Sequence, residues 1–115
     1  MTIVERVSSD VTILDIDGGI TLGPGAEDLH AAVEKLLQDG RKSILLNLDR
    51  VPVIDSAGLG RILALKKAAL MAQAKVKLLR PHGKVYAVLA ETSLAKVFEC
   101  FDAEAPAIES FHANP

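Results

Sequence analysis

Two adjacent polar residues, Asp55 and Ser56, stand where an apolar run gives way to a long amphipathic segment. Either side chain can accept hydrogen bonds from the free N–H groups in the first turn of a helix, so either can cap the helix that follows. A cap at this junction holds the Ser56 hydroxyl at the protein surface, beside the positive end of the helix dipole. Negative charge is favoured there, so Ser56 is a candidate acceptor for a phosphoryl group.

The same residues also have a plainer interpretation and an enzymatic one. Ser56 can be no more than a helix cap, worth about 1 kcal/mol. A hydrolase would place a glycine two residues before its nucleophilic serine, but Ile54 occupies that position. His30 and His82 have no neighbours at the spacing of metal ligands. We therefore predict no enzyme activity, no cofactor and no metal site.

The composition indicates a small soluble domain. With 115 residues, half of them hydrophobic, the chain suits one domain over residues 1–115. The formal net charge is −2 and no basic block stands out, which argues against direct binding of nucleic acid. Charged residues interrupt every apolar run well before the roughly 18 residues of a membrane span, and the amino terminus lacks a secretory signal. We expect a cytoplasmic protein without membrane insertion.

Turn residues and hydrophobic periodicity predict a strand hairpin followed by alternating helices and strands. Pro52 makes residues 51–54 a connection and not a continued strand. This order predicts a mixed sheet with helices, an α/β architecture. The expected elements are strands over residues 3–7 and 11–16, a helix over 25–39, a strand over 43–48, a helix from near Ser56, a strand over 76–79, short helical segments around 85–89 and 94–98, and a terminal helix within 102–111 that presents Ile108 and Phe111.

The helix that begins near Ser56 has two apolar stripes. The first consists of Gly58, Ile62, Leu65, Ala69 and Ala72, and the second of Leu59, Leu63, Lys66 and Leu70. Because a lysine interrupts the second stripe, we expect the first to pack against the sheet and the second to be partly exposed. The leucines beside Ser56 then either complete the edge of the core or form a surface for a partner.

The run Asp55-Ser56-Ala57-Gly58-Leu59-Gly60 resembles the motif of STAS domains, specifically of anti-sigma factor antagonists of the bacterial partner-switching type. The resemblance extends from Leu46-Asn47-Leu48 to the segment Leu89–Phe98, which is similar to the family's Leu-x-x-Thr-x-Leu-x-x-x-Phe pattern. It implies a STAS-like single domain with a mixed four- to five-stranded sheet and helices packed mainly on one side.

The resemblance also implies a function. An antagonist of this family binds an anti-sigma factor with serine-kinase activity and so releases a sigma factor; the kinase then phosphorylates the motif serine, and a serine phosphatase resets it. In this sequence the phosphorylated residue would be Ser56. The residues expected to bind the partner are Asp55, Ala57, Gly58, Leu59, Gly60 and Leu63.

Two positions depart from the family's pattern. Asn47 and Thr21 stand where many members have an aspartate, so contacts made by those acids in other members are not carried over. Ala57 replaces a frequent second hydroxyl and leaves one obvious acceptor. The alternative function is a STAS module that does not switch, in a stress-signalling assembly or in a lipid or anion transport system.

Overall fold

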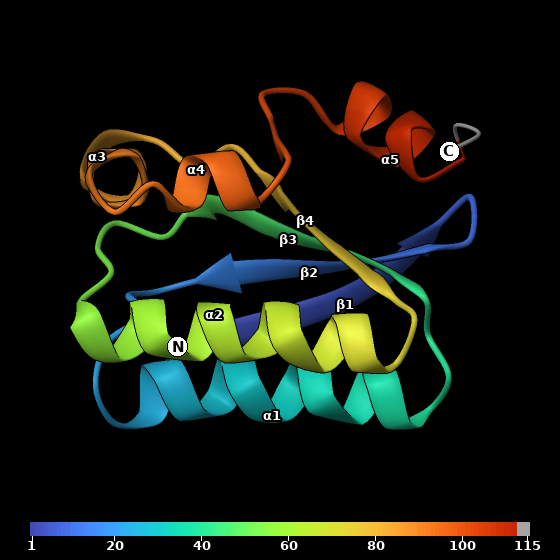
Figure 1. Ribbon diagram of the computed structural model, residues 1–115, viewed down its shortest axis with the longest axis horizontal. Coiled ribbons are helices and arrows are strands. Elements are labelled where there is room, and N and C mark those ends of the chain that lie inside the picture. The colour runs from blue at the N-terminus through green and yellow to red at the C-terminus, as the bar shows by residue number, and fades with distance from the viewer. Residues whose placement is uncertain (113–115) are drawn as a thin grey trace.

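The computed structural model describes residues 1–112 and begins with the predicted hairpin (Figure 1). Strand β1 (Thr2–Ser8) pairs antiparallel with β2 (Val11–Asp17), and Ser8 lies opposite Val11. The two residues between the strands, Ser9 and Asp10, have positive φ angles of 49° and 66°. Two left-handed residues make the tight turn whose twist matches that of paired strands, so this hairpin sets its own register.

The later elements alternate between helix and strand and complete a mixed sheet. Across residues 1–112 the strand order is β1-β2-β3-β4-β5; β1 is antiparallel to β2, and the other neighbouring strands are parallel. The predicted α/β architecture is confirmed. The elements after the hairpin are α1 (Pro24–Gln38), β3 (Ser43–Arg50), α2 (Ser56–Met71), β4 (Lys75–Leu79), α3 (Gly83–Glu91), α4 (Leu94–Val97), β5 (Cys100–Phe101) and α5 (Glu104–His112).

The boundaries differ only slightly from the predicted ones. Strand β3 is two residues longer than expected, because it continues to Arg50, which lies opposite Asp17 in the ladder with β2. Residues 51–54 form the predicted connection, in which Ile54 makes an isolated bridge with Ile20. No helix within residues 1–112 is both long and apolar enough to cross a bilayer.

The main hydrophobic core lies between the sheet and helices α1 to α4. Side chains alternate along a strand, so Leu14 and Ile16 of β2 share one face of the sheet with Leu46 and Leu48 of β3. Figure 1 shows α1 and α2 side by side beneath this sheet. Buried residues of the helices that join this core include Leu29 and Val33 of α1, Ile62 and Leu65 of α2, Val85 and Leu89 of α3, and Leu94 of α4.

The opposite face of the sheet is covered only in part, by α5 (Figure 1). Ala107 of this helix is buried in a second apolar cluster formed by the side chains of Val11, Ile13, Leu45 and Leu79. Ile108 and Phe111 are partly buried against the same cluster, as the sequence predicts. Within residues 1–112, buried side chains of α1 to α4 share the main core and α5 packs on the second cluster, which confirms that the helices pack mainly on one side.

Charged side chains hold α5 to this face at both ends. Arg6 of β1 donates to Asp15 of β2 with an Nε to Oδ2 distance of 2.7 Å, and to Glu104 with an Nη1 to Oε2 distance of 3.0 Å. Lys77, only 4% exposed, donates to Ser110 Oγ over 2.9 Å. The first turn of α5 is therefore bound to the sheet through Arg6, and its last turn through Lys77.

We expect Arg6→Gln to weaken the docking of α5 in a pH-dependent way. The Arg6 guanidinium holds the pKa values of Asp15 and Glu104 below their ordinary range. Stability from a lowered carboxyl pKa is present above the pKa of the unfolded chain, about 4, and is lost as the pH falls. Urea unfolding should show a loss of about 1 kcal/mol at pH 7 that is smaller near pH 2.5.

Arg41→Gln is the control, since Arg41 is exposed in the turn before β3. It should leave both the stability and its pH dependence unchanged. An Arg6→Gln loss of equal size at both pH values would contradict the role given to the two carboxylates.

Candidate functional site

Ser56 is the first residue of α2, and Asp55 is its N-cap. Asp55 has an extended backbone, with φ −107° and ψ −175°, and its Oδ1 accepts a hydrogen bond of 2.9 Å from the N–H of Gly58. Of the two possible caps, the structure therefore uses Asp55. Ser56 is exposed, and within residues 1–112 no side-chain hydrogen bond engages its hydroxyl. The predicted position of Ser56 at the surface is confirmed.

Asp55 also binds the loop between β2 and α1. Its second oxygen, Oδ2, accepts a hydrogen bond of 2.9 Å from the N–H of Leu22. The N–H groups of Leu22 and Gly58 hold the pKa of the Asp55 carboxyl below its ordinary value. A fixed negative charge therefore stands beside Ser56 at neutral pH.

The loop before α1 and the start of α2 approach each other closely. The Ile20 N–H donates to the Val53 carbonyl over 3.0 Å, next to the bridge between Ile20 and Ile54. A Cβ atom added to Gly58 would lie 2.0 Å from the Ile20 carbonyl oxygen. Gly58 is buried, and the absence of a side chain there lets α2 start against the loop. Its contact with a partner stays a prediction.

The other predicted partner-binding residues are accessible to different degrees. Gly60 and Leu63 are exposed, and the Leu63 side chain is 44% exposed; Ala57 and Leu59 are half-buried. The predicted division of α2 is also observed. Gly58, Ile62, Leu65 and Ala69 are buried, and Ala72 at the C-cap is half-buried. The second stripe is exposed at Leu63 and Leu70 and half-buried at Leu59 and Lys66.

Leu22 was not predicted as part of this site. It is 79% exposed and is fixed beside Ser56 through the bond from its N–H to Asp55. Its position follows from topology, because β2 and β3 are parallel neighbours and the loops that follow them leave the same edge of the sheet. The bend at Gly18-Gly19 before α1 is the sequence signal from which this loop could have been assigned to the site.

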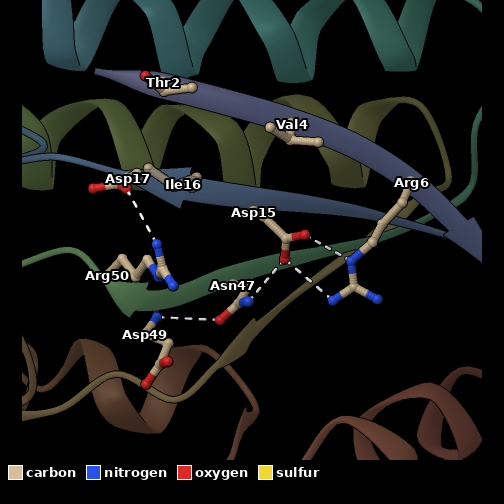
Figure 2. Close-up of a pocket in the computed structure, with 9 residues that line it drawn as sticks. All are labelled: Thr2, Val4, Arg6, Asp15, Ile16, Asp17, Asn47, Asp49 and Arg50. Carbon is tan, nitrogen blue, oxygen red and sulfur yellow. Dashed lines mark hydrogen bonds and ion pairs between the residues drawn. The ribbon is translucent and has the colours of Figure 1, made fainter.

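A pocket of about 470 Å³ lies away from Ser56, on the part of the sheet that α5 leaves uncovered (Figure 2). Its polar side chains mostly bind one another. Asn47 Nδ2 donates to Asp15 Oδ1 over 2.8 Å, and the N–H of Asp49 donates to Asn47 Oδ1 over 3.1 Å. The lining residues are Thr2, Val4, Arg6, Asp15, Ile16, Asp17, Asn47, Asp49 and Arg50. In residues 1–112 no group of three or more His, Cys, Asp or Glu side chains is arranged to hold a metal ion.

The family of the chain follows from comparison with known sequences. The family model described as the STAS domain matches residues 2–107. The chain belongs to the STAS domain family. A comparison with curated proteins gives no match.

Solved structures agree with this STAS assignment. A Thermotoga maritima protein assigned as an anti-sigma factor antagonist is 26% identical, with a TM-score of 0.83 over 96% of this chain and 95% of that one. The anti-sigma factor antagonist SpoIIAA of Bacillus, in its unphosphorylated form, is 19% identical, with a TM-score of 0.71 over 98% of this chain and all of that one.

A sulfate transporter family protein from Wolinella succinogenes also has the same fold. It is 18% identical, with a TM-score of 0.72 over 91% of this chain and 87% of that one. At this identity, as for SpoIIAA, the likeness shows a common STAS fold and nothing more. The site on α2 must therefore be argued from this chain's own residues.

We expect alanine at Gly58 and at Gly60 to have opposite effects on stability. A Cβ atom at Gly58 collides with the Ile20 carbonyl, and such overpacking costs about 1–3 kcal/mol or more. Gly60 is exposed and has no atom within 4 Å of an added Cβ, so Gly60→Ala should gain about 0.5–1 kcal/mol from helix propensity. Thermal and urea unfolding of both variants measure this difference; equal effects would contradict the close approach at Gly58.

We expect Asp55 substitutions to separate its two hydrogen bonds. In Asp55→Ala the amides of both Leu22 and Gly58 lose their acceptor and should exchange faster with deuterium. Asn has a single acceptor oxygen, so in Asp55→Asn only one of the two amides should stay protected. Ser56→Ala is the control and should change neither rate. Unchanged protection of both amides in Asp55→Ala would show that this carboxylate does not hold the two segments.

Proposed function

We propose that this STAS domain is an anti-sigma factor antagonist that is switched by phosphorylation of Ser56. In this proposal the unmodified protein binds an anti-sigma factor with serine-kinase activity and thereby releases a sigma factor. Modification of Ser56 by that kinase ends the interaction, and a serine phosphatase restores it. The likeness to the Thermotoga maritima anti-sigma factor antagonist supports the class of partner.

The observation that carries the proposal is the free, exposed hydroxyl of Ser56 at the start of a capped helix. Because Asp55 does the capping, a phosphoryl group on Ser56 breaks no bond that the fold depends on. The positive end of the helix dipole favours the added charge. Modification is therefore compatible with an intact fold.

The surroundings of Ser56 are suited to a partner that excludes water. Three apolar side chains near it are exposed: Leu22 at 79%, Val53 at 39% and Leu63 at 44%. Phosphorylation adds about 1.5 to 2 negative charges beside Asp55. Losing a buried complementary contact costs about 2 to 5 kcal/mol, roughly 30-fold to several thousand-fold in affinity. A single modification is thus sufficient to end docking.

A STAS module that does not switch remains the second candidate. The sulfate transporter family protein from Wolinella succinogenes has the same fold, so the fold alone is compatible with both functions. In that case Ser56 is a surface residue without a regulatory role, and kinases should not modify it.

Incubation of the protein with anti-sigma factor kinases and ATP, followed by mass spectrometry, tests the proposal. We expect phosphate on Ser56 in the wild type and none in Ser56→Ala. Ser56→Ala should bind the kinase like the wild type, whereas Ser56→Asp should bind at least about 30-fold more weakly. An aspartate in the first turn of a helix is favourable, so this loss should occur without a fall in melting temperature.

Ser9→Asp is the matched control, because it adds the same charge at the exposed hairpin turn, where a left-handed aspartate is tolerated. It should leave binding unchanged. Equal affinity of Ser56→Ala and Ser56→Asp, or the absence of phosphate on Ser56 with every kinase, would overturn the proposed function.

A further inference from the structure

Exposed side chains on α2 recur at an interval of seven residues. Ser56, Leu63 and Leu70 are all exposed, Leu63 at 44% and Leu70 at 66%. Seven residues are close to two turns of a helix, so successive members are displaced by only about 20° around the axis. At 1.5 Å per residue the line from Ser56 to Leu70 is about 21 Å long. One nearly straight stripe therefore joins Ser56 to the end of the helix.

The same stripe leaves room for a neighbouring backbone. Gly60 lies on this face between Ser56 and Leu63, is exposed, and has no atom within 4 Å of an added Cβ. Leu59 and Lys66 line one side of the stripe, three residues after Ser56 and Leu63. Alternating steps of three and four residues are the pattern by which one helix packs along another.

The charge of α2 is entirely positive. Its residues include Arg61, Lys66 and Lys67 and no acid. Arg61 pairs with Glu27 of α1, and the Lys66 Nζ lies 5.3 Å from the centre of the Phe98 ring. Lys67 is exposed and forms no ion pair within residues 1–112. It lies four residues after Leu63 and three before Leu70, so an unneutralised cation sits on the apolar stripe.

We infer that the partner docks along the whole of α2 and presents to it a single helix that carries apolar residues and carboxylates. The inference rests on the proposed function, because the partner is the anti-sigma factor that Ser56 regulates. A protein interface of ordinary size covers about 800 Å² on each side, wide enough to contain both Ser56 and Leu70. The carboxylates lie opposite Lys67, which a partner of opposite charge must neutralise when water is excluded.

This arrangement also predicts that phosphorylation of Ser56 weakens binding of the partner. A phosphoryl group on Ser56 stands on the same stripe as Lys67, at its other end. A helix docked over that end excludes water from the phosphate, and the desolvation of this charge opposes docking. Phosphorylation therefore weakens, at one end of the stripe, the docking that Lys67 favours at the other.

Binding to the kinase that modifies Ser56 tests the inference with Leu70→Ala and Lys67→Glu. Both residues are exposed, so melting temperatures should not change. We expect each variant to raise the Kd about tenfold, and a carboxylate-to-lysine change in the partner's docked helix to restore binding of Lys67→Glu. The matched controls are Val7→Ala, 53% exposed on β1, and Lys35→Glu, exposed near the end of α1; both should bind like the wild type.

The outcomes separate this inference from the proposed function. If Ser56→Asp loses binding while Leu70→Ala and Lys67→Glu bind like the wild type, docking is confined to the first turns of α2 and the inference is wrong. If both α2 variants lose binding while Ser56→Asp does not, the docking surface stands and the switch fails. If the wild-type protein binds no anti-sigma factor, both are wrong.

Discussion

The geometry around Ser56 depends on one carboxylate, that of Asp55. Its two oxygens accept hydrogen bonds of 2.9 Å from the Gly58 N–H in α2 and from the Leu22 N–H in the loop after β2. Parallel neighbouring strands bring these two loops to the same edge of the sheet, but topology alone does not hold them together. Asp55 holds the two loops together. Because Gly58 has no side chain, the start of α2 can lie directly against the Ile20 carbonyl. Since Asp55 satisfies the helix start, the neighbouring serine is left with a free hydroxyl on a rigid support.

A support of this kind suits regulation by charge. If Ser56 were the cap, its modification would remove a bond from the helix and couple binding to partial unfolding. With Asp55 as the cap, two anionic groups would share one helical turn after modification, and water together with the helix dipole would moderate their repulsion. A docked partner removes that water. The energetic difference between the modified and unmodified states is therefore concentrated at the interface.

Much of this architecture follows from local sequence patterns, whereas the contacts between distant segments do not. The hairpin, the amphipathic helices and the buried stripe of α2 are set by periodicity and turn residues, and they were predicted. The choice of Asp55 over Ser56 as the cap depends on a backbone angle that the residue types leave open. Leu22 joins the site only because β2 and β3 are neighbours, and Arg6 meets Glu104 from 98 positions away. Gly58 belongs to the motif expected to contact a partner, but it is buried and packs against the loop before α1.

Asn47 shows how a departure from the family's pattern is accommodated. Its amide donates to Asp15 over 2.8 Å, while its oxygen accepts from the Asp49 N–H. An aspartate at this position has no proton to donate and would set two carboxylates within hydrogen-bonding distance of each other. The Asp15 carboxylate already accepts a hydrogen bond from Arg6, which also donates to Glu104 of α5. A neutral amide at position 47 thus adds no further negative charge beside Asp15 and still donates a hydrogen bond to it. The network lies on the sheet face that carries α5, opposite the helices α1 and α2, so the side-chain hydrogen bonds of Asn47 stay on that face and involve no residue next to Ser56.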